Sequence, residues 1–262
     1  MTLRIGLVAV AALVSWVFAG LTGLQWLRKR RASQALWTVG MIFFALAVSV
    51  QLVPLLRGAW PPALYRLWYL SGAILNITFL GQGSAALALE RQRAPKRRFT
   101  VGTPLLLLAA ALVASIVVNG PLDLARLDEA TLLTGRAFAS IGEAGVATPR
   151  FWTPWFNAYG TFWLIGGALV SAWRATRLSS RATRARALGT GLIALGSLIL
   201  ASTSVLTNFF FAGAEEIGRL VGVAILFSGF VISSRTPPRR RTPWRFRPSA
   251  ANLAQPARRR PR

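Results

Sequence analysis

The sequence contains no cysteine and no histidine in its 262 residues. Without cysteine the chain forms no disulfide, no thiolate nucleophile and no thiolate metal ligand. Without histidine, zinc and haem sites lose a common ligand and a Ser-His-Asp triad is impossible. The chain also lacks a phosphate-binding loop, a dinucleotide fingerprint and any regular metal-ligand spacing. The sequence therefore predicts a protein that is not an enzyme and that holds no metal ion or other cofactor.

Acidic residues are scarce as well, since seven Asp and Glu stand against 31 Lys and Arg, for a formal net charge of +24. Charged residues make up only 15% of the chain, where a soluble domain has about a quarter, and 54% of the residues are hydrophobic. The apolar residues form separate blocks of about twenty, the length that a helix needs to cross a bilayer. This pattern predicts an all-α, polytopic membrane protein.

Seven such blocks follow one another along the chain. We expect membrane-spanning helices at residues 5–27, 35–56, 67–89, 103–119, 155–173, 188–211 and 216–233. At the start of the fourth block, Thr103 and Pro104 are typical of an N-cap and a first helical residue, so this helix should begin there. The predicted architecture is a seven-transmembrane-helix bundle over residues 1–234.

Two segments lie outside the predicted helices. Residues 120–154 form the only long connector, and their mixed apolar and charged residues favour a short surface helix near 122–133. The tail, residues 235–262, is rich in Pro and Arg without a periodic apolar pattern, so it should be disordered. A basic and aromatic part of this tail is expected to bind anionic lipid head groups through Arg239, Arg240, Arg241, Trp244, Arg245, Phe246 and Arg247.

Basic residues mark the two sides of the membrane. The connectors after the first, third and fifth blocks hold four, five and five Lys or Arg, and the tail holds ten, whereas the opposite side holds seven. Because cytoplasmic segments are the more basic ones, the tail should lie in the cytoplasm and the N-terminus outside. No soluble basic domain is left over, so we expect the lipid bilayer and not nucleic acid as the partner of this charge.

The third block is apolar yet carries Asn76, Thr78 and Gln82 at membrane depth. A lipid-facing amide without a hydrogen bond costs several kcal/mol, so this helix should lie inside the bundle. Gly72 and Gly83 share a face with Asn76, and small residues favour close packing on a neighbouring helix, with Asn76 bonding across. Two interpretations stay open, because the amides either hold helices together or line a ligand cavity.

The sixth block carries a second polar stripe, in which Ser197, Ser204 and Asn208 recur on one face. Hydroxyls in membrane helices often bond their own backbone one turn back, so the stripe is either satisfied within its helix or lines the same cavity. The candidate ligand-binding residues are therefore Asn76, Thr78, Gln82, Ser197, Ser204 and Asn208.

The seventh block opens with Glu215, Glu216 and Arg219. Glutamates favour the first turn of a helix through its dipole, and Glu215 with Arg219 has the spacing of an i,i+4 ion pair. The group is either a structural ion pair at the membrane boundary or an extracellular gate, since ionisable residues inside bundles are usually functional.

The two halves of the chain show weak parallels. Gly20 precedes Trp26 by six residues just as Gly167 precedes Trp173, and GAIL in the third block resembles GVAIL in the seventh. These matches fit either a three-plus-one-plus-three internal repeat or chance similarity between apolar helices. In a repeat, sites tend to lie near the membrane midplane between the halves.

The segment YRLWYLSGAILNITFLGQGSAAL looks like the third helix of an uncharacterised family of seven-helix integral membrane proteins from GC-rich bacteria. The resemblance implies a multi-pass protein of the bacterial cytoplasmic (inner) membrane and implies no activity. The layout is also similar to that of microbial rhodopsins and of three-plus-one-plus-three sugar transporters. No predicted helix contains a lysine, so the retinal-binding lysine of the rhodopsins is lacking.

Two functions are open at this point. Neutral polar stripes without central acids favour a protein that binds or transports a small uncharged or apolar ligand in a cavity between the third, sixth and seventh helices. The alternative is a sensory, signalling or structural subunit that acts through a membrane-protein partner at the basic cytoplasmic face.

Overall fold

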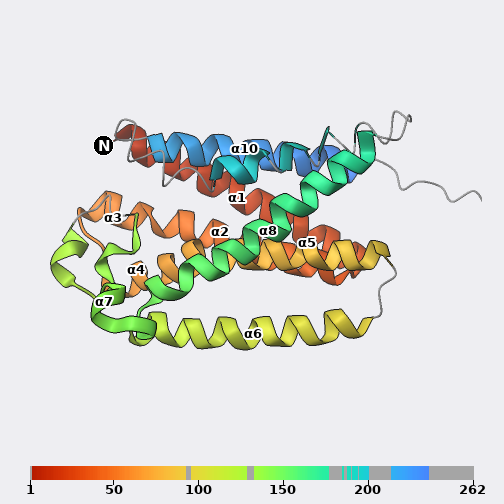
Figure 1. Cartoon of the computed structure of the whole chain (residues 1–262). Helices are drawn as coiled ribbons and strands as arrows, with labels where there is room; N and C mark the ends of the chain where they lie inside the picture. Colours follow the sequence, from red (N-terminus) through yellow and green to blue (C-terminus); the bar gives the residue numbers. More distant parts are fainter. Residues whose placement is uncertain are drawn as a thin grey trace, which may run out of the picture.

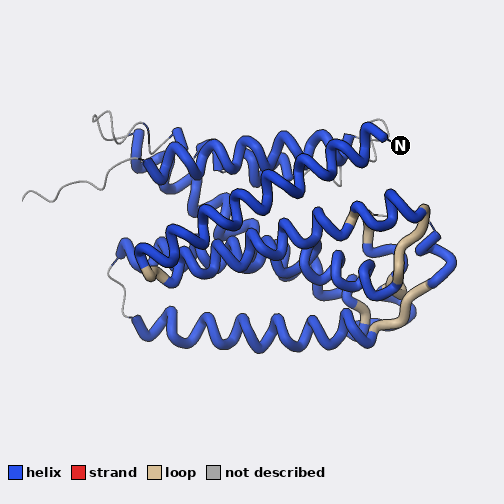
Figure 2. Tube along the Cα trace, turned by 180° about the vertical axis from the view of Figure 1, so that it is seen from behind, coloured by secondary structure: helices blue, strands red, loops and turns tan. Residues whose placement is uncertain are grey.

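In the computed structural model the chain is a bundle of helices, most of which run along one direction (Figure 1). The structure describes residues 2–92, 96–128, 133–176, 185, 188–189, 191–193, 195–200 and 214–235. No strand occurs among these residues, and an isolated bridge joins Leu122 to Phe138 (Figure 2). The all-α prediction is confirmed.

Four stretches of the described chain are long and apolar enough to cross a membrane, namely Thr2–Lys29, Ala32–Arg57, Pro62–Leu87 and Gly102–Asn119. They coincide with the first four predicted blocks. The structure therefore also confirms that the chain has several helices of membrane length. The count of seven spans and their orientation stay predictions.

The first two spans pack together and against the last helix. α1 (Thr2–Lys29) contacts both α2 (Ala32–Val50) and α10 (Ala214–Arg235). The Phe18 ring of α1 is fully buried, with its centroid 5.4 Å from that of Phe227 and 4.9 Å from that of Phe230. A short helix, α3 (Leu52–Arg57), continues the second span beyond Gln51. The span ends at Gly58, whose φ of 85° suits glycine.

The third span, called helix three below, consists of α4 (Pro62–Trp68), the π-helix η1 (Tyr69–Leu75) and α5 (Asn76–Gln92). In its most apolar window 67% of the residues are buried, against 39% in α1, so helix three is the central element. Its small residues pack closely on a neighbouring helix as predicted, and that helix is α2, since a Cβ at Gly72 would lie 2.8 Å from that of Ala47. The expected bond from Asn76 across this interface is wrong, because its Oδ1 accepts from the backbone N–H of Ile77.

The fourth span differs from the prediction at its start. α6 runs from Lys96 to Asn119 and contains Pro104 in its interior, so Thr103 is not its N-cap. The Thr103 hydroxyl instead accepts a hydrogen bond of 3.1 Å from Gln82 Nε2, a contact that no local rule anticipates. Only 17% of the most apolar window of α6 is buried. This helix therefore forms one edge of the bundle (Figure 1).

The long connector is built from short turns, η2 (Leu124–Asp128), η3 (Gly135–Ala137), α7 (Ile141–Ala144) and η4 (Gly145–Ala147). The surface helix expected near 122–133 is reduced to the 3₁₀ turn η2, and residues 129–132 lie outside the described part. A capping box starts α7, since Ser140 N donates to Glu143 Oε2 at 2.7 Å and Glu143 N donates to Ser140 Oγ at 3.3 Å. These bonds hold the pKa of the Glu143 carboxyl below its ordinary value.

The fifth helix, α8 (Pro149–Thr176), begins six residues before the predicted start and crosses helix three diagonally (Figure 1). At the crossing, Gly81 of α5 faces Gly160 of α8. A Cβ on Gly81 would lie 2.6 Å from Gly160 Cα, and a Cβ on Gly160 would lie 2.6 Å from the Ile77 carbonyl carbon. The two backbones approach so closely that only glycine fits on either side.

Of the predicted sixth helix, the described residues 188–189, 191–193 and 195–200 are helical. Gly196 packs on α10, because a Cβ there would lie 2.7 Å from the carbonyl oxygen of Gly222. The predicted seventh helix is α10, which extends it by two residues at each end. The remainder of the sixth block and the tail beyond Arg235 lie outside the described residues.

We expect Gly160→Ala to lower the free energy of unfolding by about 1–3 kcal/mol, because the added methyl group overpacks a backbone crossing. The measurement is reversible unfolding of the purified protein in detergent micelles. The matched control is Gly166→Ala on the same helix, where a Cβ would meet no atom within 4 Å. Equal stability of the two variants would contradict the crossing.

Candidate functional site

A cavity of about 570 Å³ lies beside the crossing of helix three and α8. The side chains that line it come from α2, helix three, the connector, α8, the segment 195–200 and α10. Much of its wall is apolar, including Phe44, Val48, Ile77, Leu80, Leu164, Leu200 and Leu226. Pockets for small molecules measure about 300–1,000 Å³ and combine apolar walls with a few polar groups. The cavity fits this description.

The π-helix η1 forms part of the cavity wall through Tyr69, Gly72 and Ala73. At its end the Asn76 N–H donates to the carbonyl of Ser71, five residues back, which is the π-type pattern. Such widened turns interrupt the regular helix and are frequent at functional sites. The irregular part of helix three therefore coincides with the cavity.

Polar side chains from two helices line the cavity. Asn76 presents its amide, whose Oδ1 accepts from the Ile77 N–H, so among the described residues the Nδ2 donors are the part left for a ligand. On α8 three polar residues follow one another at successive turns, namely Thr153, Asn157 and Thr161. Thr153 donates to Pro149 O at 2.9 Å and so receives the bond of 2.8 Å from the Tyr69 hydroxyl. Asn157 and Thr161 lie further along the same wall.

Charged groups gather near the start of α10. Arg219 is only 9% exposed, lines the cavity and donates from Nη1 to Gln51 Oε1. The carboxylate of Glu216, 4% exposed, pairs with Arg4 of α1 at 3.3 Å. Its second oxygen, Oε2, has no hydrogen bond within the described part of the chain. Cationic charge therefore faces the cavity, while the acidic group faces α1.

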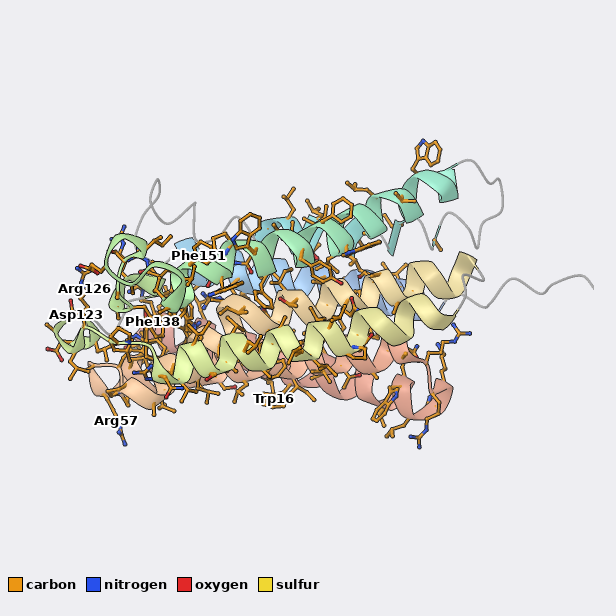
Figure 3. All side chains as sticks on the ribbon, turned by 60° about the horizontal axis from the view of Figure 1, so that its bottom comes forward. Trp16, Arg57, Asp123, Arg126, Phe138 and Phe151 are labelled. Carbon is orange, nitrogen blue, oxygen red and sulfur yellow. The ribbon has the colours of Figure 1, made fainter. Side chains whose placement is uncertain are left out.

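The connector covers one end of the cavity through Leu133, Thr134 and Gly135. It is held there by helix three, because the Tyr65 hydroxyl donates to Thr134 O. A Cβ at Gly135 would lie 2.8 Å from the Tyr69 ring, so the loop touches that ring directly. Figure 3 shows Phe138 on the bundle side of this loop and Asp123 and Arg126, which pair at 2.9 Å, at its outer end.

The cavity includes part of the ligand set predicted from the sequence. Asn76 and Ser197 line it, whereas Thr78 and Gln82 do not. The Thr78 hydroxyl donates to its own helix at Ile74 O, at 2.7 Å. Gln82 joins three helices, since it donates to Thr103 on α6 and accepts from the Tyr159 hydroxyl on α8. These contacts match the interpretation of Gln82 as an interhelical link.

The remaining predicted residues fall in two groups. Of the suggested gate, Glu215 and Glu216 lie in the first turn of α10, and Arg219 follows one turn later with the contacts given above. The other group lies outside the described residues, and comprises Ser204, Asn208, Arg239, Arg240, Arg241, Trp244, Arg245, Phe246 and Arg247.

Sequence reasoning missed Asn157, Thr161 and Gln51 as cavity residues. The first two have a recognisable signal, because Thr153, Asn157 and Thr161 recur at intervals of four and so share one face of a helix. Gln51 has no such signal. It stands at the end of an apolar block, and only the contact with Arg219, 168 residues away, reveals its place.

No known protein family, no curated protein sequence and no solved structure matches the chain. Within the described residues, no group of three or more His, Cys, Asp or Glu could hold a metal ion. The chemistry that this site offers consists of apolar contact, amide and hydroxyl groups that can donate or accept hydrogen bonds, and the buried guanidinium of Arg219. These groups suit recognition of a ligand.

The link between Gln82 and Tyr159 should be measurable as a coupling energy. We expect Tyr159→Phe to lower the free energy of unfolding more in the wild type than in the Gln82→Leu variant. The difference, which is the coupling energy, should be about 0.6–1.7 kcal/mol, the range for such bonds in membranes. Unfolding of the four proteins in detergent micelles gives this value. As a control, Tyr159→Phe should be additive with the distant Asn119→Leu, and an additive Gln82 pair would contradict the link.

Proposed function

We propose that the protein is a seven-helix integral membrane protein that binds or transports a small, largely apolar ligand in the cavity between helix three, α8 and α10. One observation carries the proposal, the cavity of about 570 Å³. It adjoins a π-helical segment and places isolated polar groups in apolar walls, as small-ligand sites do.

Support for seven spans comes from the helices that follow the four apolar ones. α8 has 28 residues and α10 has 22, enough in each case to cross about 30 Å of hydrocarbon. The described helical residues between 188 and 200 fall within the predicted sixth span, and Gly196 among them packs on α10. Together with the four apolar stretches these elements make seven.

The proposed orientation rests on charge. The N-terminus, α3, α4 and α7 lie at one end of the bundle, and the ends of α1 and α5 lie at the other (Figure 1). The basic run 28–31 lies where α1 ends, at that second end. This end therefore carries the first of the connectors that are rich in Lys and Arg. The second end would face the cytoplasm of a bacterial cell, where basic residues meet anionic lipids.

We expect Asn157→Leu to reduce the amount of ligand that co-purifies with the protein about threefold to tenfold, because one hydrogen bond from the cavity wall is lost. Native mass spectrometry of the protein in mild detergent measures this occupancy. Asn119→Leu is the matched control, since it makes the same change at the exposed end of α6, where Asn119 donates to Ser115 O at 2.9 Å.

Equal occupancy in the wild type and in both Asn variants would contradict the proposed site. Transport and binding are then separated by uptake of the identified ligand into proteoliposomes. Saturable uptake that falls in Asn157→Leu would support a transporter, and retention of ligand without uptake would support a receptor.

Topology gives a separate test. A green fluorescent protein fused after Arg262 should fluoresce, and alkaline phosphatase fused at the same place should be inactive, because the C-terminus is proposed to be cytoplasmic. The control is alkaline phosphatase inserted after Gly142 in α7, which should be active on the outer side. The reverse pattern at the two positions would overturn the orientation.

A further inference from the structure

We propose that the ligand is a neutral amide on an apolar body, and that its amide group binds where α8 crosses helix three, between Asn76, Asn157 and Thr161. This inference rests on the proposed ligand cavity. It narrows the ligand from a largely apolar molecule to one that carries an uncharged group able both to donate and to accept hydrogen bonds.

The first argument is that three polar side chains belong to the same part of the cavity wall. Gly160 of α8 touches helix three at Ile77, because a Cβ on Gly160 would lie 2.9 Å from Ile77 Cγ1. Asn76 directly precedes Ile77 in helix three. Asn157 lies one turn before Gly160 and Thr161 directly follows it, and their spacing of four puts them on one face of α8. All three polar side chains line the cavity.

The second argument is that these side chains keep hydrogen-bonding groups that the bundle does not use. Thr153, on the same helix, donates to a backbone carbonyl one turn back at 2.9 Å, as hydroxyls in membrane helices often do. Within the described part of the chain, the side chains of Asn157 and Thr161 form no hydrogen bond. Asn76 engages Oδ1 with the Ile77 N–H and keeps its Nδ2 donors. Polar groups in such a position call for a partner, and a ligand in the cavity can supply it.

The third argument is the match between these groups and an amide. Asn157 offers both a carbonyl oxygen and an NH₂ group, so it can form two parallel N–H···O bonds with another amide. Asn76 adds donors for the ligand's carbonyl oxygen, and the Thr161 hydroxyl can donate or accept. A ketone has no N–H to donate and an alcohol has a single donor, so either would leave more of the wall unpaired than an amide does.

The fourth argument limits the ligand to a neutral molecule. No Asp or Glu lies among the described residues that line the cavity, so an ammonium group would meet no counter-ion from them. Arg219 already has partners within the protein, among them Gln51, which accepts from Nη1. Burying an ionised group without a paired charge costs far more than burying a hydrogen-bonded amide. The wall beside the crossing is apolar at Leu80 and Leu164, which suits an apolar body.

The experiment compares three probes of nearly equal shape, namely hexanamide, 2-heptanone and hexanoate. The ketone carries a methyl group in place of the amide NH₂, and hexanoate carries a charged oxygen there. Each is titrated into the full-length protein in detergent micelles by isothermal calorimetry, with empty micelles as the blank. We expect saturable binding of hexanamide, about threefold to tenfold tighter than that of 2-heptanone because of the added N–H···O bond. Hexanoate should bind at least about tenfold more weakly than hexanamide.

Asn157→Leu removes the acceptor for the ligand N–H, so hexanamide and 2-heptanone should then bind within about twofold of each other. Thr161→Val removes a hydroxyl and should weaken hexanamide binding about twofold to tenfold. The matched control is Asn119→Leu, which makes the same change as Asn157→Leu at a residue outside the cavity wall and should keep the wild-type preference. If Asn157→Leu fails to fold, the order of the three probes in the wild type and in Thr161→Val still decides.

Different failures separate the two proposals. Equal or tighter binding of 2-heptanone, or a preference for hexanamide that survives Asn157→Leu, would overturn the amide site and leave the apolar cavity intact. Tightest binding of hexanoate would overturn the neutral ligand in favour of an anion. Absence of saturable binding for all three probes would overturn the amide ligand and count against the cavity as a ligand site.

Discussion

The arrangement depends on close backbone contact at glycine residues. In lipid, apolar side chains give helices little reason to associate, so packing of small residues and hydrogen bonds must hold them together. One close approach joins Gly81 of helix three to Gly160 of α8, and Gly72 and Gly196 make similar contacts with α2 and α10. The cavity follows from the first crossing, since Asn157 and other residues within one turn of it form the wall.

Hydrogen bonds divide the polar residues of the bundle into two groups. Gln82 has partners on both α6 and α8, and Thr78 bonds to its own helix, so the structure itself satisfies these side chains. Within the part of the chain that the structure describes, Asn76 and Gln51 each engage their amide oxygen with protein and keep their donors on the cavity wall. An amide that is half satisfied beside a cavity is a better indication of a ligand than an amide deep in a helix contact.

One end of the cavity is formed by a loop rather than by a helix. The connector reaches this place because Tyr65, Trp68, Tyr69 and Phe138 form an aromatic cluster, with Tyr65 and Phe138 centroids 5.6 Å apart. The hydroxyls of Tyr65 and Tyr69 then bond to the connector and to α8. Helix three thus carries the cavity wall on its π-helical turn and also anchors the segment that covers the cavity.

The sequence by itself determined the properties that local composition controls. Apolar length placed the four membrane-length helices, α8 and α10, and the glycines of helix three correctly indicated close packing on a neighbouring helix. Local rules were less reliable at helix ends. Thr103 and Pro104 have the form of a helix start, yet α6 continues past them and the hydroxyl of Thr103 bonds to Gln82 instead.

Only the tertiary structure decided which polar residues face the cavity. Asn76 and Gln82 are six residues apart in one helix and carry the same functional group, so nothing local distinguishes them. The crossing at Gly160 and the turn of η1 set the direction of each side chain, and both depend on contacts with residues far away in the chain. The pairing of Arg219 with Gln51 spans 168 residues for the same reason. Apolar length is a property of a segment, whereas a binding wall exists only where segments meet.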